Sequence, residues 1–231
     1  QQVLHITRQQ CLTDGINDGV VPLAMSRYIR ALCDPQITTI ICQGKPGTSK
    51  TYTARLVAML MLASNNATRL QHTKPLCSAG GAAVGFERGS MADKLQFWTK
   101  PTRQAAERVA KAVGIDMDAL ADQVESWPTD RTRGISIPLG EWRVADEMQN
   151  CYMPLFTCLM TRAEPGSKVV ICGDVGQSDL PSAKPSGMSK VVGAFRELLT
   201  TSRSTGNPEA ATQALAKIAE LSLSFHFVEM D

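Results

Sequence analysis

Short runs of β-branched and apolar residues alternate along the chain with longer segments in which apolar residues recur at helical spacing. This alternation is typical of a parallel sheet covered by helices. The predicted strands are residues 37–44, 69–75, 142–147, 167–174 and 224–229. The predicted helices are residues 50–64, 101–113, 116–126, 149–162, 188–200 and 207–222. We therefore expect an α/β fold with a mainly parallel sheet flanked by helices.

Composition places the chain among ordinary globular proteins. Its 231 residues are 43% hydrophobic and 20% charged, and no interdomain linker is visible, so we expect one domain over residues 1–231. The 24 basic and 22 acidic residues nearly cancel and give little indication of a partner. Seven scattered cysteines without a C-x-x-C pair indicate buried free thiols and a reducing compartment. Since no apolar run approaches the roughly 18 to 20 residues of a membrane span, we expect a cytoplasmic protein with no membrane partner.

The segment "GKPGTSKT", residues 44–51, lies between a predicted strand and a predicted helix. It matches the phosphate-loop pattern G-x-x-x-x-G-K-[ST] except that Ser49 replaces the second glycine. In such loops backbone N–H groups surround the β-phosphate, the lysine reaches the β- and γ-phosphates, and the hydroxyl binds Mg²⁺. Lys50 and Thr51 supply these two groups. The alternative is an ordinary turn, and a serine at positive φ would cost about 1 kcal/mol.

Two further segments carry polar groups directly after buried strands. In "RVADEMQN", Asp146 and Glu147 can hold a magnesium shell and activate a water molecule, as a nucleotide-hydrolysing site requires. In "VVICGDVGQSDLP", Gln177 follows Asp174 by three residues and can hydrogen-bond a γ-phosphate. Taken alone, the acidic pair would more often be a solvated strand end, and the G-D-x-x-Q segment would more often be a turn.

Together and in this order, "GKPGTSKT", "ADEMQN" and "GDVGQSDLP" resemble the PhoH family, relatives of the helicase superfamily 1 core. The resemblance extends to "HITRQQ", "TKPLCSAGGAAVGFERGSMADK", "LMTRAEPGSKVV", "SGM" and "FHFVEMD", and so covers nearly the whole chain. It implies a single RecA-like P-loop NTPase domain that binds ATP with Mg²⁺. It also implies hydrolysis associated with RNA or single-stranded nucleic acid, and a homo-oligomeric ring, often a hexamer.

The resemblance also implies roles for individual residues. Lys50 would neutralise phosphate charge, Thr51 and Asp146 would serve the metal, Glu147 would polarise the attacking water, and Gln177 would sense the γ-phosphate. The residues expected to contact the nucleotide are Gln10, which would read the adenine edge, and Gly44, Lys45, Pro46, Gly47, Thr48, Ser49, Lys50, Thr51 and Tyr52.

Three assignments implied by the resemblance, at Gln10, Arg162 and Lys74, keep alternatives. Gln9 could replace Gln10, or Gln10 could be a surface residue at a helix start. Arg162 could reach a phosphate in its own subunit or across a ring interface, or could be a cation favoured by a helix C-terminus. Lys74, with its neighbours Thr73 and Pro75, occupies the place where helicase relatives contact nucleic acid, although a lysine at a strand end is usually only solvated.

The leading hypothesis is therefore a Mg-dependent ATPase of PhoH type. The alternative, favoured by Ser49, is a nucleotide-binding interaction module with little or no hydrolysis. A third class, a small-molecule kinase, has no acceptor site among the three motifs.

Overall fold

A computed structural model describes residues 21–75, 103–112, 114, 116–181, 185–203, 206–221 and 225–230. The described strands form one six-stranded sheet in the order β3-β2-β4-β5-β1-β6. Every neighbouring pair is parallel. The strands are β1 Thr39–Gly44, β2 Arg69–Lys74, β3 Val124–Pro128, β4 Glu141–Ala145, β5 Lys168–Gly173 and β6 Phe225–Met230.

Helices connect these strands, as a parallel sheet requires. They are α2 Leu23–Cys33, α3 Lys50–Ala63, α5 Met117–Ala121, α6 Met153–Met160, α7 Gly187–Ser202 and α8 Pro208–Leu221. Residues 103–112 are also helical. Three short 3₁₀ turns complete the described structure: η2 Thr129–Thr132, η3 Met148–Asn150 and η4 Val175–Gln177.

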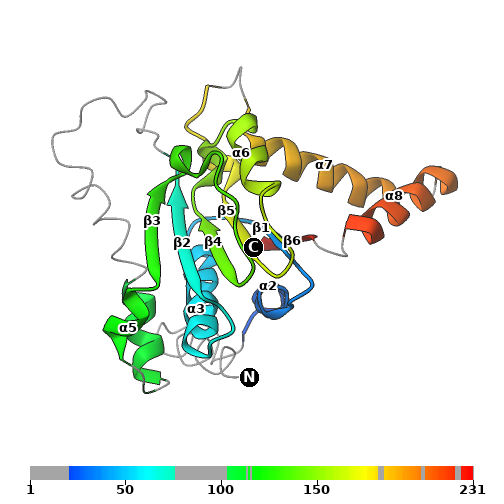
Figure 1. Ribbon diagram of the computed structural model, residues 1–231. Coiled ribbons are helices and arrows are strands. Elements are labelled where there is room, and N and C mark those ends of the chain that lie inside the picture. The colour runs from blue at the N-terminus through cyan, green and yellow to red at the C-terminus, as the bar shows by residue number, and fades with distance from the viewer. Residues whose placement is uncertain are drawn as a thin grey trace.

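The sheet has an apolar core on each face because successive strand side chains point to opposite sides. Ile40 and Cys42 of β1 belong to the core packed under α2, α3 and residues 103–112. Ile41, between them in sequence, belongs to the core packed under α6 and α7. The described domain therefore has three layers, with helices on both sides of the sheet (Figure 1).

The predicted parallel α/β fold is confirmed, and all five predicted strands are present. The predicted helix over residues 116–126 is wrong in its second half, because α5 ends at Ala121 and β3 pairs with β2 from Val124 onward. β3 is an edge strand, and its backbone hydrogen bonds to β2 could not form if the helix continued through these residues. The predicted helix at 149–162 begins four residues late, at Met153, since Pro154 fits only a first helical turn.

Helix α2 was not predicted, although its buried positions Met25, Tyr28, Ile29 and Leu32 have helical spacing. All cysteines described are free thiols, and Cys42, Cys151 and Cys172 are buried as expected. Cys33 is exposed instead, because it is the last residue of α2.

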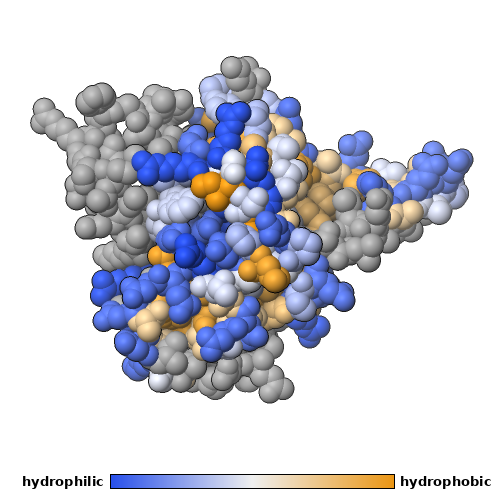
Figure 2. Space-filling view, viewed as in Figure 1, coloured by the Kyte–Doolittle hydropathy of each residue, from blue (hydrophilic) through white to orange (hydrophobic). Residues whose placement is uncertain are grey.

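The surface shown in Figure 2 is mainly hydrophilic, with small separate apolar areas. None of the helices in the described part of the chain has the length and apolar character needed to cross a lipid bilayer. Three adjacent strands, β4, β5 and β1, end at the same edge of the sheet. Because the three motifs follow these strands, the fold brings them together there.

Candidate functional site

The loop at residues 44–51 turns from the end of β1 into α3 through two left-handed residues. Gly47 has φ 80°, and Ser49, which caps α3, has φ 60° and ψ 20°. A side chain at Gly47 would meet no atom within 4 Å, so backbone conformation alone favours glycine there. Ser49 adopts the conformation that glycine tolerates best, at a cost of about 1 kcal/mol.

The ammonium group of Lys50 lies folded against its own loop. It donates hydrogen bonds to the carbonyl oxygens of Gly44 (2.7 Å) and Lys45 (2.6 Å) and to Oγ1 of Thr48 (3.2 Å). These contacts use all three donors of the lysine. An anion in the loop would therefore compete with neutral oxygens for this cation.

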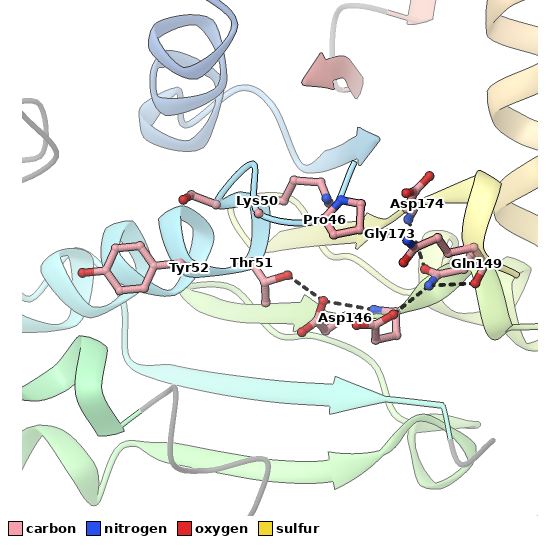
Figure 3. A pocket seen from close by; sticks show the side chains of 12 residues that line it. Pro46, Lys50, Thr51, Tyr52, Asp146, Gln149, Gly173 and Asp174 are labelled. Carbon is pink, nitrogen blue, oxygen red and sulfur yellow. Dashed lines mark hydrogen bonds between the residues drawn. The ribbon is translucent and has the colours of Figure 1, made fainter. Parts of the chain in front are cut away.

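Thr51 joins the loop to the second motif. Its Oγ1 donates to Oδ1 of Asp146 at 2.5 Å, and the backbone N–H of Glu147 donates to the same oxygen at 3.0 Å. The backbone N–H of Asp146 is itself bound to the carbonyl of Thr73 at the end of β2. The carboxylate of Asp146 is thus fixed beside the first turn of α3 (Figure 3).

The paired oxygens of Thr51 and Asp146 fit a magnesium ion. Hydroxyl and carboxylate oxygens are hard ligands of the kind that Mg²⁺ prefers, and the ion commonly binds through one or two protein groups together with substrate phosphates. Among the described residues, no group of three or more His, Cys, Asp or Glu side chains could hold a metal ion. A metal here would therefore depend on phosphate oxygens for the rest of its coordination.

Glu147 is held beside Asp146 in a strained backbone conformation, with φ 55°. Left-handed residues other than glycine cost of order 1–3 kcal/mol and are frequent at functional sites. Its Oε2 accepts a hydrogen bond from Nε2 of Gln149 at 2.7 Å, and its Oε1 lies 3.9 Å from Nζ of Lys74. The side chain of Glu147 remains 42% exposed, so a water molecule can reach it.

Gln149, which we did not predict, connects the second motif to the third. It is 1% exposed, and its Oε1 accepts a hydrogen bond from the backbone N–H of Asp174 at 3.1 Å. Its Nε2 also lies 3.5 Å from the carbonyl oxygen of Gln177. A Cβ on Gly173 would stand 2.6 Å from Oε1 of Gln149, so glycine permits this close approach. The amide two residues after the acidic pair in "DEMQ" was the available sequence signal.

The three motifs line one open pocket (Figure 3). The predicted residues that line it are Pro46, Gly47, Ser49, Lys50, Thr51, Tyr52, Asp146, Glu147 and Gln177, and they are joined by Gln149, Gly173 and Asp174. Gly44, Lys45 and Thr48 belong to the loop without lining the pocket. The ring of Tyr52 points away from the other labelled side chains, and its hydroxyl accepts a hydrogen bond from Nη1 of Arg108 at 2.7 Å.

Arg162 is not brought to this pocket. It follows α6, and its carbonyl accepts a hydrogen bond from the backbone N–H of Ile137 at 2.9 Å, near the amino ends of β4 and β5. The pocket lies at the carboxyl ends of the same strands. Gln10 and its alternative Gln9 lie outside the described residues, so the adenine-reading role stays a prediction.

Comparison with known proteins gives consistent matches. The family described as PhoH-like protein matches residues 23–204. A PhoH-like protein of Synechocystis sp. is 30% identical over 162 residues, which cover 70% of this chain and 48% of the relative. A PhoH-like protein of Mycobacterium tuberculosis is 31% identical over 176 residues, covering 76% and 49%. Protein PhoH2 of Bacillus subtilis is 30% identical over 190 residues, covering 79% and 42%.

The chain thus spans about half the length of the curated relatives it matches. The match of the family includes the phosphate loop, the acidic strand end and the third motif. Because this match covers most of the sequence and the three motifs meet in one pocket, the chain belongs to the PhoH-like protein family.

Proposed function

We propose that this protein binds ATP with Mg²⁺ in the pocket around residues 44–51 and hydrolyses it. We further propose that it does so on RNA or single-stranded nucleic acid, as a homo-oligomeric ring in the cytoplasm. The observation that carries the proposal is the hydrogen bond between Thr51 and Asp146, which joins the loop and the acidic motif at a place suited to a metal ion. An ordinary turn between a strand and a helix would not require this contact.

The loop residues would bind the phosphates. The free N–H groups at the start of α3 carry partial positive charge, which favours an anion at this end of the helix. Lys50 would exchange the carbonyls of Gly44 and Lys45 for phosphate oxygens, because a charged acceptor gives the stronger hydrogen bond. Thr51 and Asp146 would hold Mg²⁺, which supplies charge neutralisation at the phosphate oxygens.

Glu147 would accept a proton from the attacking water, since its carboxylate is exposed to the pocket and held by Gln149. Gln177 would donate from its amide to the terminal phosphate. Because Gln149 contacts both Glu147 and the backbone of the third motif, loss of that phosphate would change the position of the loop after β5.

The nucleic-acid and ring parts of the proposal rest mainly on family membership. Lys74 adds one local feature, because it places a positive charge at the carboxyl end of β2 beside Glu147. A single RecA-like domain cannot move along a strand by itself, so any translocation would need neighbouring subunits. Arg162, outside the pocket of its own chain, would contribute to catalysis only across such an interface.

The test is phosphate release with and without single-stranded RNA and DNA, with the assembly mass measured in the same buffer. We expect Lys50→Ala to lose ATP binding and turnover, and Glu147→Gln to lose turnover while still binding ATP. Lys111→Ala is the control, because Lys111 is an exposed lysine of the helix at residues 103–112, does not line the pocket and should leave both properties unchanged. Turnover that survives in both Lys50→Ala and Glu147→Gln would refute the proposal.

A second function, nucleotide-dependent interaction with little hydrolysis, is favoured by the left-handed Ser49. Its strain could keep the loop from closing around the phosphates during turnover. A large gain of turnover in Ser49→Gly over a nearly inactive wild type would support this function. Robust turnover in the wild type would exclude it.

A further inference from the structure

A partly buried ion pair joins α3 to the acidic motif at the residue proposed to hold the metal. Arg55 follows Thr51 by four residues on α3, so both side chains lie on the same side of the helix. Nη2 of Arg55 is 3.3 Å from Oδ2 of Asp146, while Thr51 holds Oδ1. The carboxylate of Asp146 is therefore fixed from two sides by one helix. Sequence reasoning passed over Arg55, although it is the one charged residue in the apolar stretch "YTARLVAMLMLA".

The second neighbour of Arg55 is a neutral histidine. His72, from β2, is 1% exposed, and its Nε2 contacts Nη2 of Arg55. A guanidinium can only donate, so Nε2 accepts and the imidazole proton lies on Nδ1. Burial lowers the pKa of His72 well below its ordinary value, and the charges of Arg55 and Lys74 lower it further. Among the described residues, Asp146 is then the acidic partner that balances the charge of Arg55.

This arrangement is energetically costly. Arg55 is 6% exposed, and neither its Nε nor Nδ1 of His72 has a hydrogen-bond partner within the described structure. Each unsatisfied buried polar group costs about 1–3 kcal/mol. Buried ion pairs can often be replaced by apolar residues without loss of stability. Packing therefore does not explain why an arginine occupies position 55. Its interaction with Asp146 does explain it.

The effect concerns the charge that a metal ion would meet. Three carboxylates line the pocket: Asp146, Glu147 and Asp174. Three cations offset this negative charge. Arg55 pairs with Asp146, Lys74 pairs with Glu147, and Lys50 lines the pocket. Without nucleotide, the surroundings are not negative enough to attract a bare divalent cation. The phosphates of a nucleotide would supply the missing negative charge.

We propose that Arg55 is a positioning residue that orients Asp146 and offsets its charge, so that the pocket accepts a divalent cation only together with a nucleotide. The inference rests on the proposed nucleotide site. It adds a role for a buried residue outside the three motifs, which keeps the nucleotide-free pocket from binding the ion alone. Thr51 and Arg55 together fix the orientation of the Asp146 carboxylate, one at each oxygen.

The experiment measures Mn²⁺ binding by electron paramagnetic resonance, with and without a non-hydrolysable ATP analogue. The proteins are the wild type, Arg55→Met, Arg55→Gln and Arg55→Lys. Arg69→Met is the matched control, since it removes one positive charge at the far end of β2. Arg55→Gln keeps a donor for Asp146 and serves as the second uncharged variant if Arg55→Met does not fold, with thermal unfolding as the check.

Without nucleotide, we expect Arg55→Met and Arg55→Gln to bind Mn²⁺ at least about tenfold more tightly than the wild type. The positive charge of Arg55 beside the Asp146 carboxylate repels the ion, and in a partly buried site the loss of this repulsion should strengthen binding by at least that factor. Arg55→Lys and Arg69→Met should match the wild type. Equal affinities in all five proteins without nucleotide, with Mn²⁺ retained by each when the analogue is bound, would overturn the inference and leave the proposed function standing.

Two outcomes need no folded variant. Nucleotide-free wild type that binds Mn²⁺ as tightly as the nucleotide-loaded protein would overturn the inference by itself. Failure of the wild type to bind Mn²⁺ even with the analogue would refute the proposed function, and the inference with it.

Discussion

Replacing Gln149 by methionine removes the link between the acidic motif and the loop after β5 while keeping the length of the side chain. The native amide donates to Oε2 of Glu147 at 2.7 Å and accepts from the N–H of Asp174 at 3.1 Å. Gln149 is 1% exposed and both bonds are partly buried, so water can replace them only in part. Gln149→Met would leave the partly buried N–H of Asp174 without its protein partner and free the carboxylate of Glu147 to rotate.

The magnitude follows from these two contacts. Loss of a partner for a buried polar group costs about 1–3 kcal/mol, and because these bonds are partly buried the free energy of unfolding should fall by an amount near the lower end, about 1 kcal/mol. A positioned general base contributes about 10²–10⁴-fold to rate. If Glu147 keeps its charge but loses its fixed orientation, part of that factor is lost, and kcat should fall by about 10- to 100-fold. The affinity for ATP should change little, because the loop at residues 44–51 is untouched.

Asn150→Leu is the matched control. Asn150 is the neighbouring amide on η3, and it bridges to the same loop through Asp179, with hydrogen bonds of 3.0 and 2.7 Å. Its own contact with Glu147 is a backbone hydrogen bond from its N–H to the carbonyl oxygen of Glu147 (3.0 Å), which Asn150→Leu retains, so this variant should lower stability to a similar extent and leave kcat nearly unchanged. Urea denaturation, steady-state turnover and fluorescent-nucleotide binding separate the two effects. Equal losses of kcat in Gln149→Met and Asn150→Leu would refute a specific role for Gln149 in orienting the carboxylate.

Two further predictions concern Ser49 and Lys168. Ser49→Gly should relieve the left-handed strain and raise the free energy of unfolding by up to about 1 kcal/mol, offset in part by the greater freedom of glycine in the unfolded chain; lower stability in urea would contradict this. Lys168 is 4% exposed and bound to carbonyls at the end of α2, and burial lowers its pKa from 10.5 to about 8, against smaller rises from Asp34 and Cys33. Between these pH values the unfolded chain holds a proton that the folded chain lacks, so the stability of the wild type should rise relative to Lys168→Met by about 3 kcal/mol as the pH increases from 8 to 10.5. A stability difference that does not change with pH in urea titrations would contradict the lowered pKa.

Local pattern predicted much of the candidate site. A glycine-rich turn after an apolar strand, with Lys50 and Thr51 at the start of a helix, is legible in the sequence because strand, turn and helix are contiguous. Asp146, Glu147 and Gln177 could be placed for the same reason, since each follows an apolar strand directly. Even the departure at Ser49 was informative, because the residue does adopt positive φ.

What could not be predicted depends on contacts between distant segments. The helix expected over residues 116–126 is replaced after Ala121 by β3, because pairing with β2 outweighs local helical preference. Arg162 has a family match in sequence, but α6 carries it to the opposite end of the sheet. Periodicity does not indicate at which end of a helix a neighbouring pocket lies.

The sequence alone determined the kind of fold, the family and the residues of the three motifs, because these depend on short-range order along the chain. Only the tertiary structure decided which side chains act together. The strand order β4-β5-β1 places Thr51 against Asp146, puts Gln149 under the loop after β5, and buries Arg55 and His72 behind the carboxylate. These partners lie far apart in sequence and on different elements, so their charges and hydrogen bonds become coupled only when the sheet forms.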